Sequence, residues 1–158
     1  MPLVKDRSAW EKIKKNLTDN SNLEVNVGVF EQSIYGPEND NLPVAQVFQW
    51  VEEGVAAQAI PPRPALRVGF MLPIQRGLYD SYFIDSIQRI AEGKSTFLKE
   101  YQKIGKMASA DLKEVIEDWN SPPNAPLTVE LKGFNNPLIE TGKLHDSITY
   151  KVEKKGIN

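Results

Sequence analysis

The sequence predicts an α+β fold, in which a small, mainly antiparallel sheet is covered on one face by a long helix and flanked by short accessory helices. Residues 23–29 and 148–153 alternate apolar and polar side chains with a period of two, which is typical of strands with one wet face. Residues 95–119 repeat apolar side chains every three or four positions, as an amphipathic helix does. Because a half-buried sheet needs a cover for its apolar face, the long helix is expected to lie across it.

The first part of the chain predicts a short helix followed by a strand. Trp10, Ile13 and Leu17 are spaced by three and four residues, with lysines on the other side. This spacing predicts an amphipathic helix over residues 6–17, broken at residues 19–22. The strand that follows is expected to pair with the carboxy-terminal strand or with another neighbour.

A polar, turn-rich loop over residues 36–43 leads into the next predicted helix. Pro43 suits the first helical position and Gly54 suits the end cap, so the helix is expected to finish at Glu52-Glu53-Gly54. Its apolar stripe, which is expected to be buried, comprises Val44, Val47, Phe48 and Val51.

Three prolines make residues 60–64 an extended segment, because a residue that precedes proline is pushed out of the helical region. Residues 66–72 either continue the extended pattern or lead into a helix that begins near Pro73 and is interrupted at Gly93. The residues that this helix is expected to turn inward are Ile74, Leu78, Tyr82, Ile87 and Ile90.

The long helix over residues 95–119 gives the strongest secondary-structure signal in the chain. Its apolar stripe comprises Phe97, Tyr101, Ile104, Ala108, Leu112, Val115 and Trp119. Prolines then predict ordered loop at residues 121–125 and 135–137. A short helical turn is expected from Glu140 or Thr141 through Leu144. We expect one domain of 158 residues: an N-terminal helix and connection (1–22), a core (23–153) and a tail (154–158).

Composition limits the classes of function. The chain has 19 basic and 21 acidic residues, so it offers no general field for holding nucleic acid. It has no cysteine and one histidine, which argues against a disulfide framework, a thiolate nucleophile and a multi-histidine metal site. The lack of cysteine fits folding in a reducing cytoplasm, and no cofactor is expected. No signal-peptide pattern and no run of about 18 apolar residues is present, so neither secretion by that route nor a membrane span is expected.

Few residues suggest catalysis. The carboxylate pairs Glu52 with Glu53 and Glu114 with Asp118 fall on predicted helix surfaces, where solvated charge is the usual explanation. His145 stands next to an aspartate but no nucleophile accompanies it, so a surface or interface histidine is the favoured interpretation.

The two proline-rich loops suggest protein contacts more strongly. Apolar Ile60, Leu66, Leu138 and Ile139 lie in stiff segments, and a stiff apolar loop loses little entropy when it docks. The loops would then suit a permanent contact, in which Arg63 and Arg67 pair with carboxylates of a neighbour. The alternative, that both loops fold back on their own core, stays open on the residues alone.

Several motifs, in order, resemble the small neck and tail-completion proteins of tailed bacteriophages, which are also described as virion-morphogenesis or putative tail-component proteins. The motifs are a helix end at Glu53-Gly54, Ile-Pro-Pro-Arg-Pro-Ala-Leu-Arg at 60–67, Ser-Pro-Pro-Asn-Ala-Pro at 121–126, and Pro-Leu-Ile-Glu-Thr-Gly-Lys-Leu at 137–144 followed by Ser147-Ile148. The last block is the most specific. The resemblance extends over roughly residues 24–152.

This resemblance implies a non-enzymatic virion component that forms a six-fold ring at the head–tail junction and resides in the host cytoplasm before assembly. Its expected partners are identical subunits, head-completion or adaptor proteins, and the tail terminator or tail tube, while DNA passes through the channel without specific binding. Together with Ile60 of the first stiff loop, the expected contact residues are Pro61, Arg63, Leu66, Arg67, Leu138, Thr141, Gly142 and Leu144.

Two alternatives remain open. One is a related connector role, as the tail terminator or the head-completion adaptor itself. The other belongs to a different class: a small hydrolase or nucleic-acid enzyme that uses Glu52, Glu53, Asp118 or His145.

Overall fold

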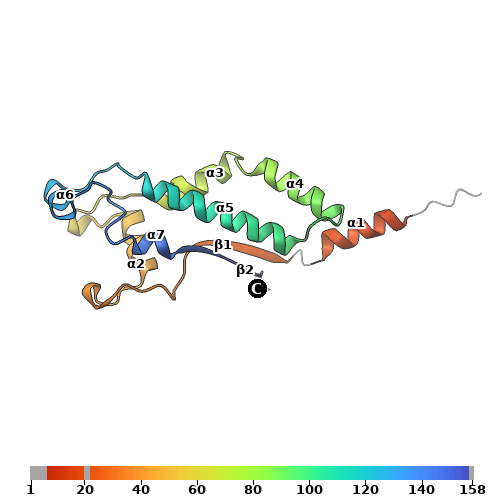
Figure 1. Ribbon diagram of the computed structural model, residues 1–158, viewed down its shortest axis with the longest axis horizontal. Coiled ribbons are helices and arrows are strands. Elements are labelled where there is room, and N and C mark those ends of the chain that lie inside the picture. The colour runs from red at the N-terminus through yellow and green to blue at the C-terminus, as the bar shows by residue number, and fades with distance from the viewer. Residues whose placement is uncertain (1–6, 20–21, 157–158) are drawn as a thin grey trace, which may run out of the picture.

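Two strands from opposite ends of the chain form the sheet. The computed structural model, which describes residues 7–19 and 22–156, pairs β1 (Leu23–Val29) with β2 (Ile148–Lys154) in an antiparallel ladder (Figure 1). The register places Leu23 opposite Lys154 and Val29 opposite Ile148. The predicted pairing of the first strand with the carboxy-terminal strand is therefore confirmed.

The long helix α5 (Phe97–Glu117) packs against both strands, which confirms the predicted α+β fold. Thr96 caps its first turn by accepting a hydrogen bond from the backbone N–H of Lys99 at 3.3 Å. The helix approaches the sheet closely at Gly105, where an added Cβ would overlap the ring of Tyr150 on β2. A residue without a side chain is therefore required at this position.

The main core lies at the end of the molecule where α2 (Val44–Glu53), α7 (Lys143–Ser147) and the last turns of α5 meet. Its buried members are Val44, Phe48, Ala65, Leu112, Ile116, Leu138, Leu144 and Ile148. The predicted apolar stripes of α2 and α5 contribute to this core, as expected from their helical spacing.

The remaining elements are helical. They are α1 (Ser8–Thr18), η1 (Pro37–Asn39), η2 (Ala56–Gln58), the π-helical turn η3 (Arg67–Met71), α3 (Leu72–Gln75), α4 (Asp80–Ala91) and α6 (Pro126–Lys132). Among the described residues, no helix is both long and apolar enough to cross a membrane. Residues 1–6, 20–21 and 157–158 include the predicted helix start at residue 6, part of the predicted break and the end of the predicted tail, and they lie outside the described residues.

The helix α6 lies between the two predicted loop segments, 121–125 and 135–137, where no helix was predicted. Its first residue is Pro126, and proline is favoured there because the missing N–H would have no partner in the first turn. Gly133 then ends the helix in the left-handed conformation, with φ of 77°. This short helix was not predicted because prolines lie on either side of it and favour loop.

The extended alternative for residues 66–72 is wrong, because η3 and α3 make this segment helical. The helix expected from Pro73 is also not continuous, since Gly77 adopts φ of 68° and separates α3 from α4. Of its expected inward residues, Ile90 is buried and Tyr82 half-buried. Ile87 is exposed because α4 turns the side with Ser86 towards α5, as described below. Ile74 on α3 and Leu78 in the turn before α4 are exposed as well.

Candidate protein-interaction surfaces

The two proline-rich loops are bonded to each other through Arg63. Its Nε donates to the carbonyl of Pro122 at 3.3 Å and its Nη2 to the carbonyl of Pro123 at 3.4 Å. The side chain is buried, and this burial lowers the pKa of Arg63. We call this contact the loop junction; it fixes the position of one loop relative to the other.

Asn136 joins the second loop to the end of α5. Its Nδ2 donates to the carbonyls of Ile116 and Glu117 at 2.9 and 2.8 Å, and its Oδ1 accepts from the N–H groups of Leu138 and Ile139. These bonds satisfy carbonyls that the helix end leaves free. Asn136 falls within the predicted loop 135–137, and an asparagine before proline is a recognised turn signal, but its bonds to α5 were not predicted.

Glu52 anchors the first loop from α2. Its carboxylate accepts hydrogen bonds from the backbone N–H groups of Leu66 at 2.9 Å and Arg67 at 3.2 Å. Burial raises the pKa of Glu52, and these hydrogen bonds oppose that effect. The interpretation of Glu52 as solvated charge is therefore wrong, since it is half-buried and caps the helical segment that follows the prolines.

The nine predicted contact residues differ in exposure. Arg63, Leu138 and Leu144 are buried within the chain, and Arg67 and Thr141 are exposed. The half-buried members are Ile60, Pro61, Leu66 and Gly142. Four of the nine, Leu138, Thr141, Gly142 and Leu144, line one cavity of about 440 Å³ between α2, α6 and the last loop.

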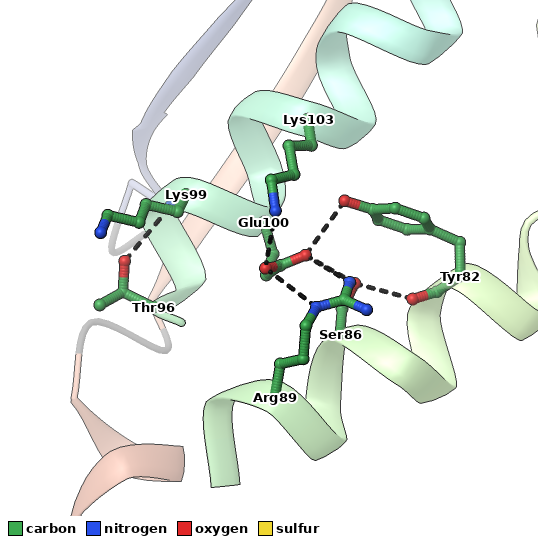
Figure 2. Close-up of polar contacts among 7 residues, drawn as sticks. All are labelled: Tyr82, Ser86, Arg89, Thr96, Lys99, Glu100 and Lys103. Atoms are coloured by element: carbon green, nitrogen blue, oxygen red, sulfur yellow. Dashed lines mark hydrogen bonds and ion pairs between the residues drawn. The ribbon is translucent and has the colours of Figure 1, made fainter. Parts of the chain in front are cut away.

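The helix α4 is joined to α5 by a polar cluster around Glu100, whose side chain is only 1% exposed (Figure 2). Its Oε2 accepts from Arg89 Nη2 at 2.7 Å, and from the hydroxyls of Ser86 and Tyr82, both at 3.0 Å. Its Oε1 accepts from Arg89 Nε at 3.3 Å and from Lys103 Nζ at 3.4 Å. The bond from Arg89 holds the pKa of Glu100 well below its usual range, despite burial.

This polar cluster leaves apolar side chains on the outside of α4. Phe83, Ile84 and Ile87 are 39%, 67% and 53% exposed, and their spacing places them on one side of the helix. We call residues 71–91 the arm. Its exposed apolar residues are Met71, Ile74, Leu78, Phe83, Ile84 and Ile87. An amphipathic helix with its apolar side turned outward indicates a surface that another molecule covers.

An open cavity of about 750 Å³ lies between the arm and the C-terminal half of α5, and we call it the acidic groove. Its apolar walls include Val68, Pro73, Leu78, Met107 and Val115. Its carboxylates are Asp111, Glu114 and Asp118, and no basic residue lines it among the described residues. Asp111 accepts a hydrogen bond from the Tyr79 hydroxyl, and burial with this bond raises the pKa of Tyr79.

The candidate catalytic residues are not assembled into one site. Glu53 accepts from Gln49 at 3.2 Å, while His145 lies 2.8 Å from Glu117 and 3.0 Å from Asp146. Within residues 7–19 and 22–156, no hydrogen bond or ion pair joins His145 to Glu52, Glu53 or Asp118. The same part of the chain holds no group of three or more His, Cys, Asp or Glu side chains arranged to bind a metal ion.

Comparison with known proteins identifies no relative. No family model, no curated protein and no solved structure matches this chain. The surfaces described above are therefore the structural basis for a functional proposal.

Proposed function

We propose that this chain is a structural protein of a tailed-phage neck, which forms a ring at the head–tail junction and joins connector proteins to the tail. The proposal combines the resemblance of residues 24–152 to neck and tail-completion proteins with the surfaces of the fold. In this proposal the protein acts by contact, not by catalysis, and it resides in the virion after assembly.

The outward apolar side of α4 is the observation that carries the proposal. Large apolar side chains at 39–67% exposure follow one another along this helix, while its inner side holds Ser86 and Arg89 against a buried carboxylate. Contiguous exposed apolar surface of this kind marks protein contacts. A neighbouring subunit or connector protein that covers the arm would remove this surface from water.

The loop junction supports the same proposal through its stiffness. A repeated head-to-tail contact closes into a ring only if the contacting surfaces hold one angle. Arg63 and Asn136 bond the two proline-rich loops to each other and to α5, so the half-buried and exposed loop residues keep fixed positions. Such a preorganised surface loses little entropy on docking.

The charge of the chain agrees with a channel through which DNA passes. The formal net charge is −2, and tight phosphate binding needs clustered lysine and arginine. A ring of such subunits would let DNA move through without specific binding.

The experiment measures the mass of the assembly. Native mass spectrometry and electron microscopy of the full chain with the head-completion protein of its own phage are expected to show closed rings. A chain that stays monomeric beside that partner contradicts the proposal. A ring at another level of the virion, seen in a virion map, would instead indicate a tail terminator or a head-completion adaptor.

A matched pair of variants tests the role of the arm. Ile84→Lys places a charge on the apolar side of α4 and is expected to prevent ring formation. Asp85→Lys places a lysine at an exposed acidic position of the same helix, which points away from Phe83 and Ile87, and is expected to leave rings intact. Equal ring formation by both variants would count against the arm as a contact surface.

A further inference from the structure

The first helix carries an apolar stripe that the described chain covers only in part. Near its C-terminal end α1 is held to the end of α4, where Asn16 Nδ2 donates to the carbonyl of Ala91 at 3.1 Å. Ile13 and Leu17 are half-buried there, whereas Trp10, on the same side of the helix, is 62% exposed. Figure 1 shows α1 extending away from the sheet and α5 at one end of the molecule.

Basic residues flank the exposed tryptophan. Lys14 lies four residues after Trp10 on α1, and Arg7, the N-cap residue of the helix, lies three residues before it, so both are near Trp10 on the same side. Both are exposed, and no ion pair of the described residues uses either of them. The exposed end of α1 therefore combines an aromatic side chain with positive charge.

The acidic groove has the complementary character. Glu114 and Asp118 are exposed on the same side of α5, four residues apart, and their carboxylates have no hydrogen-bond or ion-pair partner among the described residues. Apolar walls lie beside them, and Leu78 in particular is 67% exposed. An aromatic side chain flanked by two cations fits a groove of this composition.

The α1 helix of the same copy does not lie in this groove. Its last turn is bonded to Ala91, beyond the N-terminal end of α5, whereas the groove is lined by the half of α5 that begins at Met107. The two surfaces thus lie towards opposite ends of α5. A contact between them joins two copies head to tail, which is the kind of interface that closes into rings.

We propose that the end of α1 in one copy docks into the acidic groove of the next copy. Trp10 enters the apolar part of the groove, and Arg7 and Lys14 pair with Glu114 and Asp118. This inference names a contact of the ring and rests on the proposed function for its biological setting. The contact itself is between two copies of this chain and is tested without any other partner.

Site-directed cross-linking tests the contact directly, because the chain contains no cysteine of its own. One preparation of the full chain carries Lys14→Cys and a second carries Asp118→Cys; they are mixed and oxidised. The expected product is a disulfide-linked dimer that contains one chain of each kind. The control replaces Lys14→Cys with Lys12→Cys, on the opposite side of α1, and is expected to give at least about tenfold less of this dimer.

Charge reversal provides an independent measurement. The double variant Arg7→Glu with Lys14→Glu, and the double variant Glu114→Lys with Asp118→Lys, are each expected to weaken association of the full chain by at least about tenfold. An equimolar mixture of the two is expected to regain association, because the opposite charges again face one another. Unchanged association of the two double variants, with no gain of association in their mixture, would overturn the inference.

The outcomes separate the inference from the proposed function. If rings form but Lys14→Cys and Asp118→Cys do not cross-link, the α1 contact is overturned and the proposal of a neck protein is unaffected. The cross-link without rings, even beside the head-completion protein, would support the contact and count against the neck protein. If neither the rings nor the cross-link is found, both the neck-protein proposal and the α1 contact are contradicted.

Discussion

Arg89 on α4 and Glu100 on α5 form the ion pair that holds the arm to the long helix, with Nη2 and Oε2 2.7 Å apart. The carboxylate is almost completely buried, and the guanidinium is the partner that lowers its pKa most strongly. Because the inner side of α4 is occupied by this polar cluster, the apolar side of the helix faces outward. The buried carboxylate of Glu100 thus determines which side of α4 is exposed.

Removing the charge of Glu100 is expected to destabilise the fold. Glu100→Gln removes the charge from the buried acceptor of the hydrogen bonds from Arg89 and Lys103, and weakening such charge-assisted bonds is expected to cost about 1–3 kcal/mol. The free energy of unfolding, from urea titration followed by circular dichroism, measures this loss. Glu130→Gln, which changes an exposed acid on α6, is the control and is expected to change stability by less than about 0.5 kcal/mol. Equal stability of the two variants would show that the cluster contributes little.

The same residue predicts a pH dependence. Since the pKa of Glu100 is lower in the folded than in the unfolded state, its stabilising contribution is complete above the unfolded value, about 4.3 for glutamate. It is lost as the pH falls below that value and through the lowered folded pKa. The difference in unfolding free energy between the wild type and Glu100→Gln is therefore expected to be largest at neutral pH and to shrink in acid. A difference that stays constant from neutral pH into acid contradicts this assignment.

The loop junction predicts unequal effects for two neighbouring arginines. Arg63→Ala removes the buried donor of the hydrogen bonds to the carbonyls of Pro122 and Pro123, which is expected to cost about 1–3 kcal/mol. Arg67→Ala removes an exposed side chain and is expected to change the unfolding free energy by less than about 0.5 kcal/mol. The backbone N–H of Asn124 directly follows Pro123 and donates to Asn135 Oδ1 at 3.0 Å. Its hydrogen exchange is expected to accelerate in the first variant only, because this segment then loses its bonds to Arg63. If Arg67→Ala proves the more damaging of the two, the loop junction does not stabilise the fold.

The adjacent acids Glu52 and Glu53 provide a similar comparison. Glu52→Ala removes the acceptor for the N–H groups of Leu66 and Arg67, which is expected to cost about 1 kcal/mol, as for other helix caps. Glu53→Ala removes an exposed side chain whose one hydrogen bond to a described residue is with Gln49, and it is expected to be close to neutral. Thermal unfolding of both variants checks the difference. An enzymatic role would instead appear as lost activity in a variant that keeps its wild-type stability.

The sequence could predict elements whose signal lies within one segment. The strands, α2 and α5 were predicted with nearly correct boundaries, because alternation or helical spacing persists over several residues in each. The helix α6 was missed because it is short and flanked by prolines that favour loop. The burial of Glu100 was also unpredictable from its own segment, since its partners Tyr82, Ser86 and Arg89 come from another helix.

The candidate site shows the same division. Prolines correctly marked residues 60–64 and 121–125 as segments outside the helices and strands, because proline restricts the backbone through local geometry alone. Only the tertiary structure showed that Arg63 bonds one loop to the other, since the two segments are far apart in the sequence.

The sequence by itself determined the class of fold, the position of the long helix and the stiffness of the loops, because each follows from local periodicity or backbone restriction. The tertiary structure decided which side of α4 faces water. Apolar residues at helical spacing show that the two sides of a helix differ in polarity. Which side is buried depends on the side chains that the neighbouring helix presents to it. Here α5 offers the carboxylate of Glu100, whose burial requires polar partners, so the side with Tyr82, Ser86 and Arg89 turned inward and Phe83, Ile84 and Ile87 remained outside.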